Sequence, residues 1–110
     1  VNDQKRTPTY VFDICQGIET IILGNHDGIF HLAGSEIITP YEMAVEVANC
    51  LSLNVNLIEA VDSTTFPEPV KRAKQSGLKI DRAQAILNYK PHSFAEGVRK
   101  SFLADQLLNN

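Results

Sequence analysis

Residues 3–13 read Asp3-Gln4-Lys5-Arg6-Thr7-Pro8-Thr9-Tyr10-Val11-Phe12-Asp13, a dense polar stretch that leads into an apolar helical pattern. Pro8 and Thr9 favour a turn. Asp13 and Gln16 have the spacing of an N-terminal capping box, in which two side chains three residues apart satisfy backbone donors. We therefore expect a polar loop followed by a helix that begins at Asp13, with Asp13 acting only as its cap.

The predicted first helix carries one apolar stripe at helical spacing and stops near Gly24. The members of this stripe are Ile14, Cys15, Ile18, Ile21 and Ile22. Cys15 and Cys50 lack the spacing of metal ligands, and both fall on apolar helix faces. We expect each of them to be a buried free thiol, which weakly favours a reducing, cytoplasmic compartment.

Three further capping boxes predict three further helices. They pair Thr39 with Glu42, Asp81 with Gln84, and Ser93 with Glu96. Pro40 follows the first cap, at a position where its missing N–H costs nothing. The side chains expected to face inward are Tyr41, Ala44, Val47, Ala48 and Leu51 in the helix after Thr39, and Phe94, Val98, Phe102 and Leu103 in the helix after Ser93.

Two short apolar runs have strand character, residues 29–33 after a turn signal and residues 56–61 after the second helix. Alternation of such strands with helices favours an α/β fold with parallel pairing. Residues 62–77 contain Pro67 and Pro69 and show no clear period, so we expect a long surface loop there.

Length and composition restrict the function classes. The 110 residues are enough for one domain with a modest core. A net charge of −3 and a pI near 5.5 argue against a nucleic-acid surface. The densest basic cluster, formed by Lys71, Arg72 and Lys74, is too small for a DNA footprint. No apolar run approaches the roughly 20 residues that span a bilayer.

The sequence contains no self-sufficient catalytic motif. His26, His31 and His92 are scattered and lie near no cysteine or paired carboxylates at ligand spacing, so we expect neither a metal site nor catalytic residues. The six glycines never form a dinucleotide-binding loop after a strand. None of the three tyrosines has a lysine four residues further on. We therefore expect no cofactor-binding residues in this chain.

Residues 3–13, 28–34 and 72–76, in that order, resemble the C-terminal, sugar-nucleotide-binding part of the dTDP-4-dehydrorhamnose reductase family, a branch of the extended short-chain dehydrogenases/reductases. Arg6 and Ala73 depart from the family pattern, which has glycine and proline at these positions. The resemblance implies that residues 1–110 form a single substrate-binding domain, an α/β C-terminal lobe of a Rossmann-type reductase with about four helices and short parallel strands. The N-terminal cofactor domain of a longer two-domain protein would then be absent.

The resemblance also implies a function. The full-length protein would be an NAD(P)-dependent oxidoreductase that uses NADPH or NADH. This fragment alone would be inactive and would bind a nucleoside-diphosphate sugar. The resemblance also allows for a homo-oligomer. Arg72 is the strongest candidate contact, because a planar guanidinium matches phosphate oxygens. The implied substrate-binding residues are Gln4, Arg6, Thr9, Arg72 and Ser76. Two alternatives stay open: a related epimerase or dehydratase, and a non-catalytic regulatory subunit like that of methionine adenosyltransferase.

Overall fold

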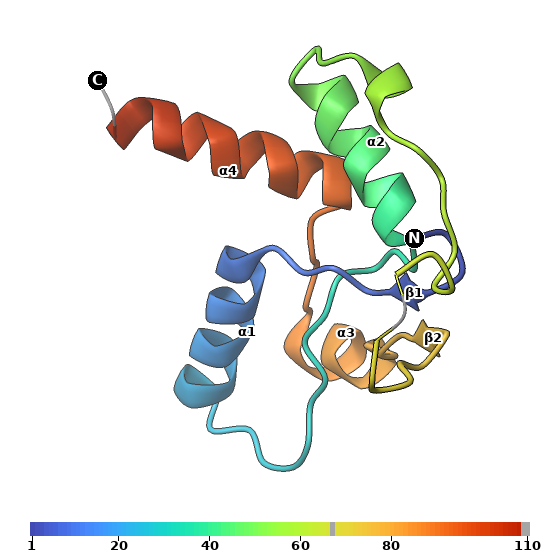
Figure 1. Ribbon diagram of the computed structural model, residues 1–110. Helices are drawn as coiled ribbons and strands as arrows, with labels where there is room; N and C mark the ends of the chain where they lie inside the picture. The colour runs from blue at the N-terminus through green and yellow to red at the C-terminus, as the bar shows by residue number, and fades with distance from the viewer. Residues whose placement is uncertain (67, 109–110) are drawn as a thin grey trace.

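Two helix pairs and a minimal sheet make up the chain. The computed structural model describes residues 1–66 and 68–108, with side chains through residue 102. Helix α1 packs against α3 and α2 packs against α4, and the two pairs lie at opposite sides of a region of extended chain (Figure 1). The expected α/β fold with four helices and short parallel strands is confirmed. The elements in chain order are β1 (Lys5–Arg6), α1 (Val11–Leu23), α2 (Pro40–Cys50), a 3-10 turn (Val55–Leu57), β2 (Gln75–Ser76), α3 (Asp81–Leu87) and α4 (Phe94–Leu108).

The sheet joins segments far apart in the sequence. Strands β1 and β2 run parallel, with Arg6 opposite Ser76. The backbone of Arg6 also exchanges two 2.9 Å hydrogen bonds with Ile38 in an antiparallel bridge. Strand β1 therefore lies between the end of the 62–77 loop and the segment that leads into α2.

The strand predictions for residues 29–33 and 56–61 were wrong. Within the described residues, neither segment belongs to a strand, and residues 55–57 form a 3-10 turn that begins where the Asn54 side chain accepts a hydrogen bond from the backbone N–H of Asn56. The prediction of a loop over residues 62–77 holds except for its last part, where Gln75 and Ser76 pair with β1. Apolar runs of this length can pack as irregular chain, and pairing requires a neighbouring strand.

The core is small and centres on α3. Ala33, Ile80, Ala83, Leu87 and Tyr89 form its buried cluster. The Tyr89 hydroxyl donates a 2.9 Å hydrogen bond to the Ala33 carbonyl oxygen. Burial, assisted by the nearby Asp13 charge, raises the pKa of Tyr89 to about 12. The radius of gyration is 16.4 Å, against about 13 Å for a compact domain of similar length, so the described chain is open rather than spherical.

One of the four predicted capping boxes is complete, and a second is half formed. Thr39 and Glu42 bond reciprocally at 3.1 Å, with Pro40 at the start of α2 as expected. The Ser93 hydroxyl accepts a 3.2 Å hydrogen bond from the Glu96 N–H at the start of α4. The other two were wrong: α1 begins at Val11 after an uncapped Tyr10, and α3 begins at Asp81 after an uncapped Ile80.

The apolar stripe of α1 is largely exposed. Ile22 is 69% exposed, and Ile18 is also exposed. The prediction that Cys15 is buried was wrong, since Cys15 is exposed, whereas Cys50 is half-buried. In α2 and α4, Ala48 and Val98 face inward as expected. Leu51 and Phe102 are more exposed than predicted, and the side chain of Leu103 lies outside the described residues.

The first residues are fastened to several distant segments. The Asn2 N–H donates to the Val61 carbonyl oxygen at 2.8 Å. The Asp3 carboxylate accepts hydrogen bonds from the backbone N–H and the hydroxyl of Ser63, at 3.0 and 2.6 Å. These hydrogen bonds lower the pKa of Asp3. Among the helices that the structure describes, none is long and apolar enough to cross a membrane.

Candidate functional site

A cationic cavity lies between the N-terminal segment and the 62–77 loop. Its volume is about 370 Å³, which falls within the usual range for a small-molecule site. Three cations and one carboxylate line it, so its field attracts anions. The lining residues are Val1, Gln4, Ser63, Phe66, Glu68, Pro69, Val70, Lys71, Arg72 and Lys74.

The cavity brings together two of the residues predicted to bind substrate, Gln4 and Arg72, which are 68 positions apart in the sequence. The Arg72 Nε atom donates to Glu68 Oε2 at 2.6 Å, and this contact raises the pKa of Arg72. The Arg72 and Glu68 side chains are 62% and 49% exposed, so water screens the pair and the contact adds little to stability. Arg72 therefore keeps its charge at the rim of the cavity and is not locked in place.

Arg6 is occupied by contacts within the fold. One terminal nitrogen of its guanidinium donates to the carbonyl oxygens of Lys5 and Ala73, at 2.8 and 3.0 Å. The other approaches Gln4 Oε1 at 3.4 Å. Arg6 thus connects β1 to the residue before Lys74, and it borders the cavity through Gln4 without lining it.

Thr9 and Ser76 lie outside this cavity. The Thr9 hydroxyl donates to the Thr7 carbonyl oxygen at 3.1 Å and accepts from the Gly34 N–H at 3.0 Å. A Cβ on Gly34 would lie 2.0 Å from the Pro8 carbonyl oxygen, so glycine lets the two segments approach at this crossing. Ser76 is exposed in β2. The structure therefore divides the five predicted residues among a cavity, a strand pair and a chain crossing.

Thr9 instead borders a second cavity of about 440 Å³, which is mainly apolar. This groove runs between the segment that leads into α1 and the first half of α4. Its lining residues are Pro8, Thr9, Tyr10, Val11, Val47, His92, Ser93, Phe94, Gly97, Val98, Ser101 and Phe102.

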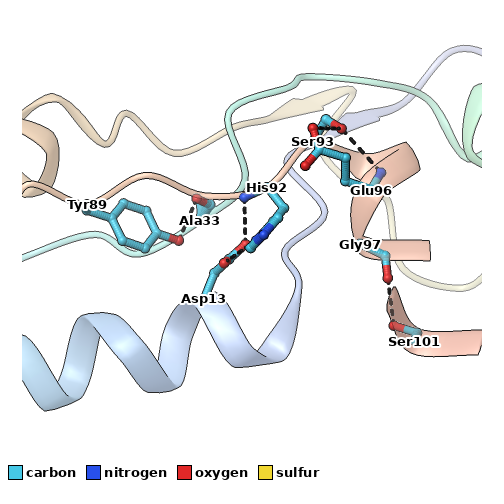
Figure 2. Close-up of polar contacts among 8 residues, drawn as sticks. All are labelled: Asp13, Ala33, Tyr89, His92, Ser93, Glu96, Gly97 and Ser101. Atoms are coloured by element: carbon cyan, nitrogen blue, oxygen red, sulfur yellow. Dashed lines mark hydrogen bonds and ion pairs between the residues drawn. The ribbon is translucent and has the colours of Figure 1, made fainter. Parts of the chain in front are cut away.

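Two contacts between Asp13 and His92 fix one wall of this second cavity. Asp13, buried in the first turn of α1, accepts a 2.8 Å hydrogen bond from the His92 backbone N–H. Its other oxygen lies 2.7 Å from His92 Nδ1, and Figure 2 shows the two side chains pointing toward each other across the gap between α1 and the chain before α4. Asp13 therefore acts in tertiary structure, and the prediction that it only caps the helix was wrong.

Sequence reasoning missed the other charged members of the cationic cavity. The sequence marks Lys71 and Lys74 as part of a basic cluster but does not place them at a binding cavity, and no sequence pattern singles out Glu68. Their proximity to Arg72 in the sequence was the available signal. Within the described residues, no three His, Cys, Asp or Glu side chains are grouped to hold a metal ion.

The chain is similar to dTDP-4-dehydrorhamnose reductases. The curated reductase from Aggregatibacter actinomycetemcomitans is 29% identical over an alignment of 110 positions, gaps included. This alignment covers 90% of this chain and 37% of that protein. A crystal structure of the reductase from Clostridium acetobutylicum matches with a TM-score of 0.87 and 25% identity, over 96% of this chain and 38% of the other. The reductase structure from Yersinia enterocolitica, at 21% identity and a TM-score of 0.74, covers 90% of this chain and 34% of its own, and supports the fold alone.

The chain spans little more than a third of the length of these relatives. The profile of one family, described as the RmlD substrate binding domain, matches residues 1–107, which is nearly the whole chain. The chain belongs to the RmlD substrate-binding domain family.

Proposed function

We propose that this chain holds the nucleotide end of a nucleoside-diphosphate sugar within a longer NAD(P)-dependent reductase. The observation that carries the proposal is the cavity in which Gln4 meets Arg72, Lys71 and Lys74. A diphosphate carries closely spaced negative charges, and cations on one wall match that pattern. Membership in a substrate-binding family supports the same assignment.

In this proposal the two kinds of polar residue have different roles. Arg72 meets a phosphate oxygen as a charged donor, and the amide of Gln4 supplies a neutral hydrogen-bonding group on the facing wall. Arg6 acts indirectly, because its guanidinium connects the Gln4 side chain to the backbone of the 62–77 loop. Ser76 and Thr9 keep the strand and the chain crossing in register and reach the substrate only if the sugar extends beyond the cavity.

Such contacts contribute to catalysis without touching the reacting bond. Binding energy from a remote part of the substrate can position the reacting sugar. The nicotinamide, NADPH or NADH, would be bound by a separate cofactor domain, which would also supply the hydride and the proton donor. For the whole protein we propose the reduction of a 4-keto sugar, because its relatives are named dTDP-4-dehydrorhamnose reductases.

Calorimetric titration of a dTDP-sugar and a UDP-sugar into the protein that carries this chain tests the proposal. Arg72→Ala should weaken binding by about 1–3 kcal/mol, because a hydrogen bond to a charged group is lost. The matched control is Arg99→Ala, which removes an exposed arginine of α4 outside the cavity lining. Unchanged affinity in Arg72→Ala would remove Arg72 from the site, and equal losses in both variants would show that only net charge matters.

A further inference from the structure

The cavity already contains an anion of its own. The Glu68 carboxylate lines the same cavity as Lys71, Arg72 and Lys74, and it lies 2.6 Å from Arg72 Nε. Of the three cations that line the cavity, Arg72 forms an ion pair with a carboxylate within the described residues, whereas Lys71 and Lys74 do not. The guanidinium proposed to meet a phosphate is therefore already facing a negative charge.

We propose that Glu68 is an autoinhibitory residue that competes with the phosphate of an incoming ligand for Arg72. This inference rests on the proposed function and deepens it by naming what regulates the same site. Glu68 is four residues before Arg72 in the same loop, and its carboxylate occupies a position beside the guanidinium that a phosphate oxygen would also take. A phosphate that binds Arg72 must displace this carboxylate or lie beside it.

The exposure of the pair sets the size of the effect. Both side chains are about half exposed or more, and double-mutant cycles on such pairs give small coupling energies because water screens the charges. The competition is therefore weak enough for a diphosphate with several cationic contacts to overcome. Removal of the Glu68 charge should raise the affinity for a phosphate anion by about two- to fivefold.

The sign of the change in anion affinity on replacing Glu68 distinguishes inhibition from a supporting role. If Glu68 instead oriented Arg72 for its ligand, loss of the carboxylate would weaken anion binding. If Glu68 acted only through the overall charge of the protein, any exposed carboxylate would have the same effect. The proposed competition requires tighter binding that depends on Arg72.

A double-mutant cycle with inorganic pyrophosphate as the probe tests this prediction. Pyrophosphate is titrated by calorimetry into the unmodified chain, Glu68→Gln, Arg72→Gln and the double variant, at one fixed ionic strength. Glu59→Gln is the matched control, since Glu59 is exposed and lies outside the cavity lining. Circular dichroism of each variant checks that the fold is intact.

The expected result is binding about two- to fivefold tighter in Glu68→Gln, no change in Glu59→Gln, and loss of the gain when Arg72 is also replaced. Weaker or unchanged binding in Glu68→Gln would overturn the autoinhibitory role while leaving the anion site intact, provided that Arg72→Gln still lowers affinity. The same gain in the Glu59 control, or the same gain without Arg72, would also overturn it. If pyrophosphate binds neither the unmodified chain nor Glu68→Gln, or binds without regard to Arg72, the inference and the proposed site fail together.

Discussion

Asp13 binds His92 through both of its carboxylate oxygens, although the two residues are 79 positions apart in the sequence. Only 3% of Asp13 is exposed. The ring of Tyr10 packs edge-on against the imidazole of His92, with 5.6 Å between ring centroids. The contact therefore fastens the first turn of α1 to the chain that leads into α4, and it positions His92, which lines the apolar cavity together with Tyr10.

Replacement of Asp13 should destabilise the fold more than replacement of most other carboxylates. Asp13→Ala leaves the His92 N–H without its acceptor, and we expect a loss of about 1.5–3 kcal/mol in the free energy of unfolding, measured with urea. Asp13→Asn should lose less, because the amide oxygen can still accept from the His92 N–H. A change within about 0.5 kcal/mol in Asp13→Ala would contradict a structural role.

The hydroxyl of Tyr89 should ionise only in strong alkali. Its pKa is raised to about 12 by burial, above the value of about 10 for an unfolded tyrosine. The stabilisation is therefore complete below pH about 10 and is lost as the pH rises toward 12. Ultraviolet titration of tyrosinate should show a transition near pH 12 that Tyr89→Phe removes. Absence of that transition would be inconsistent with the buried hydrogen bond.

The contact between Asp3 and Ser63 should make stability depend on acid. The pKa of Asp3 is lowered from its ordinary 3.8 by hydrogen bonds from Ser63. A group with a depressed pKa in the folded state stabilises the fold above its unfolded pKa, and this contribution disappears as the pH falls through the folded value. Asp3→Asn should therefore be less stable than the unmodified chain at neutral pH, with the difference shrinking in acid. Urea unfolding of both proteins at neutral pH and in acid measures this difference in stability. A difference that does not change with pH would argue against the ionised contact.

The exposed apolar side chains of α1 should promote self-association of this chain. Phe12, Ile18, Ile22 and Leu23 lie on the surface of one helix, each at least 47% exposed, and such patches usually mark an interaction surface. Sedimentation velocity should detect association that rises with concentration. Ile22→Glu should reduce it, whereas Leu57→Glu, which changes an exposed apolar residue of the 3-10 turn, serves as the control. A monomer at all concentrations would contradict this prediction, because it would show that the apolar face of α1 stays exposed to water without associating.

The chain by itself should neither bind NADPH nor reduce a sugar nucleotide. Nicotinamide dinucleotides of this type bind where glycines let the backbone approach the pyrophosphate at a helix N-terminus, and the six glycines here do not have that spacing. Fluorescence titration with NADPH should be flat. Saturable binding at micromolar concentrations would overturn the assignment of this chain as a substrate-binding domain.

Local signals in the sequence predicted the helices better than they predicted the contacts between them. The Thr39 capping box and Pro40 define the start of α2 through residues that are neighbours in the chain. Both features could therefore be predicted from the sequence. Asp13 has the same spacing to Gln16, yet its carboxylate binds His92 instead. Residue spacing cannot reveal a partner that only the tertiary fold supplies.

The same limit applies to the strands and to the candidate site. Strands β1 and β2 have two residues each, which is too short for any periodic pattern. The pairing of Gln4 with Arg72 in one cavity could be anticipated only from the resemblance to a family. The place of Glu68 in that cavity depends on the path of the 62–77 loop, which no local motif encodes.

The connections of the N-terminal segment also have a consequence for the timing of synthesis. Asp3 bonds to a residue 60 positions later, and the Arg6 guanidinium bonds to the Ala73 carbonyl oxygen 67 positions later. At about 5–20 residues per second, translation needs roughly 3–13 s to cover that distance. During this interval β1 lacks its partner strand β2, so residues 3–6 acquire these contacts only after residues 63–76 have been synthesised.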